Sequence, residues 1–235
     1  MLKVIGLDIG QVNDATAAVG LEVVPTVAKL PYIGQDPETG ILTDRTMEVE
    51  GPPCEFLVRD LTRFPLGMEY PAIIDATASI VRRVPGATLV VDQTGVGRPI
   101  YDALVSRALA PIGVTIVGGA TARWEGRQAW VPKGDLISGV QLALEQRRMR
   151  FAGKLVAVEQ LIKELLSMEF KVSIAGNVQY GAWREGTNDD LVLALAIAAW
   201  FGEQEYGARA QALVAATQSD QVTALHGGYG GISPY

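Results

Sequence analysis

Short apolar runs recur along the first part of the chain, and residues that bend the backbone follow each of them. Residues 3–7 and 15–24 predict two strands joined by a turn, which form an antiparallel hairpin. Residues 25–53 are rich in Pro, Gly, Asp and Thr, so they predict either a further hairpin or an extended loop. Residues 55–62 alternate well enough between apolar and polar positions for a third strand.

From residue 71 the pattern alternates between helical spacing and short apolar runs. It predicts a helix over 71–83, a strand over 88–91, a helix over 98–109 and a strand over 114–117. Strands that alternate with helices after an antiparallel start indicate a mixed α/β sheet with helices on its faces.

The rest of the chain predicts further helices and ends in a tail of unusual composition. We expect an aromatic and basic loop over 118–129, helices over 132–146 and 155–168, a hairpin over 170–183, and a last helix that begins at Asp189-Asp190. After Tyr206 the chain is rich in Ala and Gln and then in Gly, which is typical of disorder. We therefore expect one domain over 1–206 and a flexible tail over 207–235.

Composition narrows the possible chemistry. Of 235 residues, 49% are hydrophobic and 20% are charged, which predicts a globular chain with a sizeable core. With one Cys and one His, the chain can build neither a thiolate zinc site nor a His-centred triad, so carboxylates are the main chemistry. We find no signal segment, and the apolar run 191–201 is too short to cross a bilayer, so an intracellular soluble protein with no membrane contact is expected.

Acidic residues stand where strands end or helices begin. Asp8 follows the first strand, Asp92 follows the strand over 88–91, and the pair Asp189 and Asp190 opens the last helix. Each alone could be a turn or capping residue. Together they can converge on one point, where a divalent cation would relieve their repulsion, and all-oxygen ligation suits Mg²⁺ or Mn²⁺. Two such ions can activate a water and stabilise the leaving oxygen of a phosphodiester, so we expect a phosphate substrate.

Four segments stand out together: Gly6-Leu7-Asp8-Ile9-Gly10 with Asp14 and Thr16, Val90 to Gly97, Lys133-Gly134-Asp135-Leu136, and Asn188-Asp189-Asp190-Leu191-Val192. They resemble the nuclease domain of the large terminase subunit of tailed bacteriophages, in the ribonuclease H-like superfamily. The resemblance extends to about Tyr206. It implies a five-stranded mixed sheet flanked by helices, with an added hairpin over 170–184 beside the site.

The resemblance also implies a function. The chain would be an endonuclease that uses two Mg²⁺ or Mn²⁺ ions to cut double-stranded DNA with little sequence specificity during viral genome packaging. Its metal ligands would be Asp8, Asp92 and one or both of Asp189 and Asp190, with Lys133 as a charge partner. Its partners would be a packaging ATPase domain or subunit, a small terminase subunit and a portal, in the cytoplasm of a bacterial host.

The sequence departs from the family pattern in two places. Many members carry His where this chain has Asn188, and no Gly-x-x-x-x-Gly-Lys-Ser/Thr motif is present. By this resemblance, the chain would be either the nuclease half of a packaging motor or a stand-alone relative.

Basic residues in segments that should rim the same end of the sheet are candidates for phosphate contacts. These residues are Arg123, Arg127, Lys133 and Arg184.

Three alternatives stay open. A Holliday-junction resolvase would use the same nuclease chemistry. An actin-like or sugar-kinase-like protein would use residues 6–10 as its first phosphate loop, but such proteins need about twice this length. An interaction module without catalysis would keep an acidic cluster that costs stability when no cation is bound.

Overall fold

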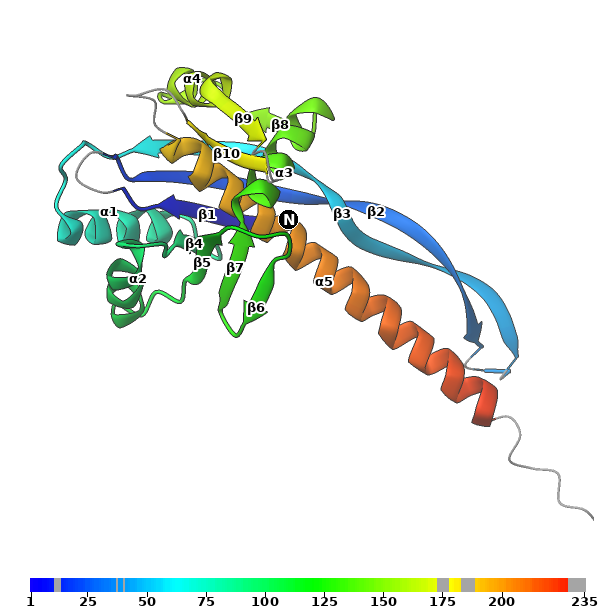
Figure 1. The fold of residues 1–235 in the computed structure, drawn as a ribbon. Coiled ribbons are helices and arrows are strands. Elements are labelled where there is room, and N and C mark those ends of the chain that lie inside the picture. Colours follow the sequence, from blue (N-terminus) through cyan, green and yellow to red (C-terminus); the bar gives the residue numbers. More distant parts are fainter. Residues whose placement is uncertain (11–13, 37, 40, 173–177, 183–188, 228–235) are drawn as a thin grey trace, which may run out of the picture. The chain divides into compact units, whose positions relative to one another are not determined.

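The computed structural model describes residues 1–10, 14–36, 38–39, 41–172, 178–182 and 189–227 (Figure 1). The strands are β1 Leu2–Asp8, β2 Ala17–Gln35, β3 Leu42–Arg63, β4 Thr88–Asp92, β5 Ile112–Val117, β6 Arg123–Glu125, β7 Gln128–Pro132, β8 Met149–Phe151, β9 Met168–Val172 and β10 Val178–Ala182. The helices are α1 Tyr70–Arg83, α2 Gly97–Ser106, α3 Lys133–Glu145, α4 Val158–Ser167 and α5 Asp190–Gly227. Each helix expected from apolar spacing is present, which confirms those predictions.

The main sheet has the strand order β6-β7-β5-β4-β1-β2-β3-β8. β1 pairs antiparallel with β2 and parallel with β4, and β4, β5 and β7 continue in parallel. The mixed α/β class is confirmed, and the five expected strands lie next to one another as β3-β2-β1-β4-β5. The expected number of strands is wrong, because the short strands β6, β7 and β8 extend this core at both edges.

One correction concerns the loop expected over 118–129. Much of it forms the hairpin of β6 and β7, in which Arg123 is the register partner of Trp130. Gly126, with a φ of 57°, makes the turn between the strands, because this backbone region suits glycine. The guanidinium of Arg123 lies 4.4 Å from the centre of the Trp130 ring, so a contact across the two strands holds this hairpin together.

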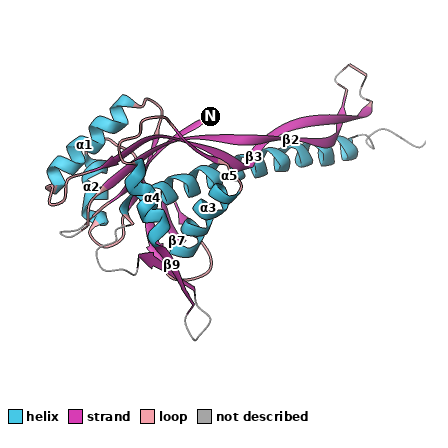
Figure 2. Cartoon of the chain, turned by 90° about the horizontal axis from the view of Figure 1, so that it is seen from above, coloured by secondary structure: helices cyan, strands magenta, loops and turns pink. Residues whose placement is uncertain are grey.

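The apolar core has two layers, one on each face of the sheet. On one face, Ile5 and Leu7 of β1 and Leu89 and Val91 of β4 pack in a cluster with residues of α1 and α2, two helices that lie side by side (Figure 2). On the other face lies the first part of α5, in which residues 191–199 are all buried. A helix that is apolar all round belongs inside a protein, which explains why this stretch carries no polar stripe.

Gly6 sets the distance between β1 and α5. A Cβ atom on Gly6 would lie 2.0 Å from the carbonyl oxygen of Ala194, so only glycine permits this approach of strand and helix. Because side chains alternate along a strand, Gly6 and Asp8 share the face of β1 that α5 covers, while Leu7 points to α1 and α2. The start of α5 and the end of β1 are therefore brought to one place.

The chain divides into two compact units, Met1–Val24 with Glu55–Gly202 and Pro25–Cys54 with Glu203–Tyr235. β2 and β3 are far longer than the sequence predicted, because both continue into the second unit, and the hairpin alternative for residues 25–53 is confirmed. Residues 207–227 continue α5 as helix, where a flexible tail was expected. Residues 228–235 lie outside the described part. No helix among the described residues is both long and apolar enough to cross a membrane.

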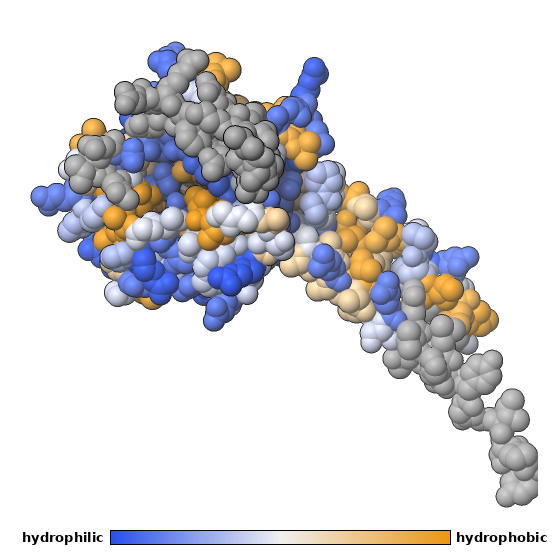
Figure 3. Space-filling view, viewed as in Figure 1, coloured by the Kyte–Doolittle hydropathy of each residue, from blue (hydrophilic) through white to orange (hydrophobic). Residues whose placement is uncertain are grey.

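The second unit is the acidic part of the chain. It carries three Lys and Arg residues against eight Asp and Glu residues, a net charge of −5 out of −6 for the whole sequence. Hydrophobic and hydrophilic residues alternate along its visible surface (Figure 3). The first unit is therefore close to neutral, with a net charge of −1.

Candidate metal centre

Asp8 and Asp92 end two neighbouring parallel strands. The register that sets Leu7 beside Val91 places the two aspartates side by side at the carboxyl edge of the sheet. Both face α5, because Leu7 and Val91 point to the opposite face. Both are buried, with exposed fractions of 7% and 8%. Two adjacent carboxylates out of water repel each other, so this pair is a natural place for a cation.

Thr94 fixes the orientation of Asp92. Its backbone N–H and its hydroxyl both donate to Oδ1 of Asp92, at 2.8 and 2.5 Å. The hydroxyl oxygen in turn accepts the N–H of Ile116, at 2.8 Å, and so ties the turn after β4 to β5. Because one oxygen of Asp92 is held by two donors, the carboxylate keeps one orientation without a metal.

The acidic pair at the start of α5 is held by two basic residues from other elements. Arg63, the last residue of β3, donates from Nε and Nη2 to Oδ2 of Asp190, at 3.2 and 2.9 Å. Lys133, the first residue of α3, donates from Nζ to Oδ2 of Asp189, at 2.7 Å. The Asp190 side chain is 5% exposed and that of Asp189 is 23% exposed. Asp190 is therefore the inner member of the pair.

A buried glutamate holds the backbone at the start of α5. Oε2 of Glu164, on α4, accepts the N–H groups of Leu191 and Val192 at 2.9 and 3.2 Å. These amides belong to the first turn of the helix, where no backbone carbonyl can reach them. Gln160 donates to the other oxygen of Glu164, at 3.2 Å. The position of Asp190 thus depends on a carboxylate that lies 26 residues earlier in the chain.

The electrostatic potential of the site is strongly negative. Burial raises the pKa of Asp8 well above its usual range, and the nearby charges of Asp92, Asp190 and Asp189 raise it further. Burial also raises the pKa of Asp92, although the bonds from Thr94 oppose this change. For Asp190, burial raises the pKa and Arg63 opposes it. Charge on these groups is unfavourable without a cation, as expected for carboxylates gathered from separate elements.

The donor set suits a hard divalent cation. Asp8, Asp92 and Asp190 offer only oxygen atoms, which Mg²⁺ and Mn²⁺ prefer. As the side chains stand, no three acidic, His or Cys residues within the described ranges already surround a common metal position. The ion pairs of Asp189 and Asp190 each turn one carboxylate oxygen toward a basic side chain.

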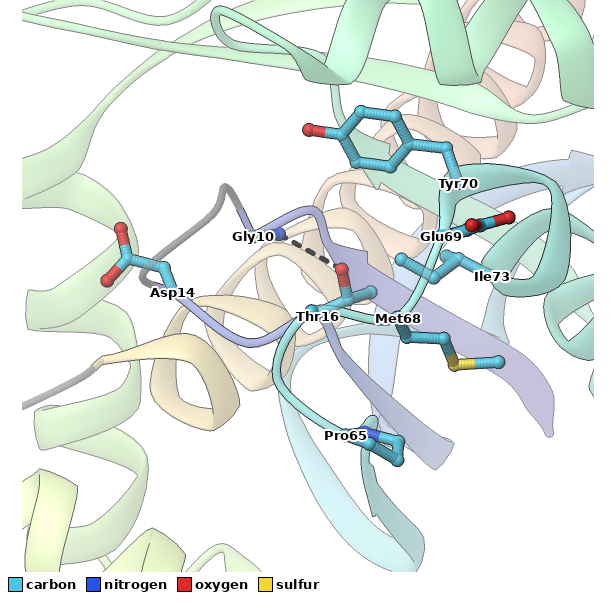
Figure 4. A pocket seen from close by; sticks show the side chains of 9 residues that line it. Gly10, Asp14, Thr16, Pro65, Met68, Glu69, Tyr70 and Ile73 are labelled. Atoms are coloured by element: carbon cyan, nitrogen blue, oxygen red, sulfur yellow. Dashed lines mark hydrogen bonds between the residues drawn. The ribbon is translucent and has the colours of Figure 1, made fainter.

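A hollow of about 300 Å³ lies beside the turn that follows Asp8. It is lined by Gly10, Asp14, Thr16, Pro65, Gly67, Met68, Glu69, Tyr70 and Ile73 (Figure 4). The N–H of Gly10 donates to Oγ1 of Thr16, at 3.1 Å, within this turn. This amide is therefore already bonded inside the protein, which disfavours the alternative of a phosphate-binding loop over residues 6–10.

The structure brings five of the expected site residues together, namely Asp8, Asp92, Lys133, Asp189 and Asp190. It does not bring Arg127 to them. Arg127 precedes β7 and binds the carbonyl oxygens of Ala110 and Pro111, which precede β5. The amino ends of these parallel strands lie opposite the edge that carries Asp92, so the expected placement of Arg127 on that rim is wrong.

The other two candidates have different outcomes. The side chain of Arg123 is exposed but engaged with Trp130 in the β6–β7 hairpin. Arg184 lies outside the described residues, as does Asn188.

Sequence reasoning missed Arg63, Thr94 and Glu164. Arg63 directly follows the strand expected over 55–62, and strand-end position was the signal that identified Asp8 and Asp92. Applied to basic residues as well, the same signal would have found Arg63. Glu164 gave no signal, because it lies within an ordinary amphipathic helix.

The fold is that of a ribonuclease H-like mixed α/β domain. Among the solved structures that it matches are nuclease domains of phage large terminases. The terminase nuclease of thermophilic phage G20c with bound cobalt matches at a TM-score of 0.55 and 18% identity, over 85% of this chain and 80% of that one. The G20c nuclease with bound magnesium gives a TM-score of 0.52 at the same identity and coverage.

A second phage provides a similar match. The large terminase nuclease domain of bacterial virus Sf6, with manganese and β-thujaplicinol, gives a TM-score of 0.55 and 13% identity, over 85% of this chain and 88% of that one. Identities this low establish a shared fold alone. No protein-family model matches the sequence, and no curated protein matches it significantly.

Proposed function

We propose that this chain is a metal-dependent endonuclease that hydrolyses phosphodiester bonds of double-stranded DNA, with little sequence preference, during the packaging of a viral genome. One observation carries the proposal: Asp8, Asp92 and Asp190 come from three elements and converge at one edge of a ribonuclease H-like sheet. The similar folds that hold cobalt, magnesium or manganese support the choice of a divalent cation.

Asp8, Asp92 and Asp190 would hold two Mg²⁺ or Mn²⁺ ions, with Asp189 as a more exposed ligand. Bound there, such ions supply an activated water and stabilise the charge on the leaving oxygen. Thr94 orients Asp92 for this role, and Glu164 holds the helix start that carries Asp190. Lys133 keeps positive charge beside Asp189, close to where a phosphate would approach.

DNA would bind to the first unit. That unit is nearly neutral, whereas the second unit is strongly acidic and would repel a polyanion. The proposed phosphate contacts are Lys133, at the site itself, Arg123 and Arg184. Phosphate contacts position DNA without reading its sequence, which is why we expect little sequence preference.

By the same resemblance of motifs and fold, we propose that residues 1–206 form the nuclease domain. A packaging ATPase, a small terminase subunit and a portal would be its partners, in the cytoplasm of a bacterial host.

Plasmid cleavage by the purified chain tests this function. We expect nicking and linearisation with Mn²⁺ or Mg²⁺, none with EDTA, and similar rates on plasmids of unrelated sequence. The matched control is Asp102→Asn, which removes an exposed carboxylate of α2 that pairs with Arg98 in the same helix. This control should cut like the wild type, whereas Asp8→Asn should be inactive. Cleavage that continues in EDTA, or full activity of Asp8→Asn, would contradict the proposal.

A further inference from the structure

Arg63 is the one basic side chain that the described residues show bonded to Asp190, the inner carboxylate of the helix-start pair. Its guanidinium directs two nitrogens, Nε and Nη2, to the same oxygen, Oδ2. The Asp190 side chain is 5% exposed and that of Arg63 is 31% exposed. The bond therefore joins a buried acceptor to a donor that still reaches solvent.

The position of Arg63 follows from the topology of the sheet. β3 is antiparallel to β2, which is antiparallel to β1, so β3 and β1 run in the same direction (Figure 1). Arg63 at the end of β3 and Asp8 at the end of β1 consequently lie at the same edge. Since β2 lies between them, Arg63 approaches the acidic cluster from its outer flank, while Asp92 lies on the other side of Asp8.

A buried carboxylate without a partner costs folding free energy. The charges of Asp14 and Asp189 also repel the charge of Asp190. Arg63 offsets this cost in the protein without metal. A divalent cation that binds Asp190 would offset the same charge, and it would be repelled by the guanidinium at short range. The Arg63 guanidinium and the divalent cation would thus both neutralise the Asp190 carboxylate, and they would repel each other.

We propose that Arg63 is a built-in counter-ion of the metal centre: it holds the Asp190 carboxylate in place while the site is empty and competes with the divalent cation for it. This inference rests on the proposed metal-dependent function and adds a positioning residue to it. Arg63 makes the empty site stable and ordered, and in exchange it weakens the binding of the metal.

The test is calorimetric Mn²⁺ titration of wild type, Arg63→Gln and Arg63→Lys, together with melting curves in EDTA and in saturating Mn²⁺. Removing one positive charge several ångströms from a divalent ion should tighten Mn²⁺ binding by about tenfold. Arg63→Gln should also melt at a lower temperature than the wild type in EDTA, and this difference should shrink in Mn²⁺. Arg63→Lys, which keeps the charge, should bind Mn²⁺ nearly as the wild type does.

The chain offers a matched control four residues earlier on the same strand. Arg59 pairs with Glu22 of β2 through Nη2 at 2.6 Å and Nε at 2.7 Å, in a more exposed setting. Arg59→Gln should change neither the Mn²⁺ affinity nor the gap between the two melting temperatures.

The inference would be overturned if Arg63→Gln bound Mn²⁺ no more tightly than the wild type and lost as much melting temperature in Mn²⁺ as in EDTA. Arg63 would then be merely structural. Failure of the wild type itself to bind Mn²⁺ would instead overturn the proposed function, and the counter-ion role with it.

Discussion

The two carboxylate pairs of the site are built in opposite ways. Asp8 and Asp92 stand at adjacent strand ends, are almost fully buried and, among the described residues, form no ion pair with a basic side chain. Asp189 and Asp190 stand at a helix start, and each has its own basic partner. Backbone pairing of β1 and β4 fixes the first pair, whereas side chains from β3, α3 and α4 adjust the second.

Because of this difference, the two pairs should respond differently to a bound cation. The strand-end pair has no ion-pair partner among the described residues, although the charge of Lys133 acts to lower the pKa of Asp92, so it should be the part of the site that gains most from a cation. The helix-start pair is already neutralised, so it can gain or lose a cation at lower cost. Removing a member of each pair should therefore have different consequences.

The largest effects should come from the strand-end pair and from Asp190. Asp92→Asn should lower the rate of metal-dependent plasmid cleavage by more than about 100-fold, because losing a ligand should exceed the 10- to 100-fold loss typical of a supporting residue. Single-turnover assays across Mn²⁺ concentrations will measure this. A variant that recovers wild-type rates at high Mn²⁺ would place Asp92 outside the essential ligand set.

The two members of the helix-start pair should contribute unequally to cleavage. Asp190→Asn should abolish cleavage, because this side chain is the more buried one and its charge acts on Asp8. Asp189→Asn should reduce the rate less, since its carboxylate is the more exposed and lies toward Lys133. Nicking assays run side by side on the two variants will measure this difference in cleavage rate. An inactive Asp189→Asn beside an active Asp190→Asn would reverse the assignment of inner and outer residue.

Thr94→Val should have an intermediate effect. It removes the hydroxyl that donates to Asp92 but keeps the backbone N–H, so Asp92 loses one of its two donors. Mn²⁺ affinity should fall by about 10- to 100-fold, as is common for groups that orient a ligand. Thr94→Ser, which keeps a hydroxyl, should restore most of the affinity, and equal losses in both variants would point to packing instead.

A smaller effect concerns stability without metal. Since the pKa of Asp8 is raised above its ordinary value of 3.8, the folded protein keeps a proton there that the unfolded chain has lost. Stability in EDTA should therefore fall as pH rises from about 4 through the raised pKa. Asp8→Asn should flatten this slope and melt a few degrees higher at pH 7. Melting curves between pH 4 and 8 test this, and a steeper slope in the variant would contradict it.

The smallest effect should come from Arg127. Its guanidinium is bound to backbone carbonyl oxygens before β5, at the end of the sheet away from the carboxylates. Arg127→Gln should change the cleavage rate by less than about twofold while lowering the melting temperature slightly. A large loss of DNA affinity with normal stability would show that DNA reaches this end of the sheet.

Sequence reasoning located the parts of the site that depend on local pattern. Asp8 and Asp92 could be found because an apolar run precedes each of them, and Asp190 because it opens a strongly apolar helix. The order of the five core strands then brought these residues together, as the expected class of fold requires. The metal-dependent function and the ligand roles of these residues stay predictions of the chemistry of the site.

Sequence reasoning failed where long-range contacts decide. The pairing of Arg63 with Asp190 spans 127 residues, and Glu164 reaches the start of α5 from another helix. Neither pairing leaves a trace in local spacing. The basic loop expected over 118–129 proved to be largely an edge hairpin. Its first strand, β6, has only three residues, which are too few to show alternation. The direction of β7 alone decides which end of the sheet its flanking residues reach.

The most direct test of the metal centre is an anomalous difference map from crystals soaked in millimolar Mn²⁺. The proposal predicts one or two peaks within about 2.0–2.3 Å of carboxylate oxygens of Asp8 and Asp92, with Asp190 completing the site. It also predicts that Arg63 moves away from Asp190 or binds it less closely. No peak at this edge of the sheet, or peaks held only by other residues, would contradict the claim that these carboxylates form a metal centre.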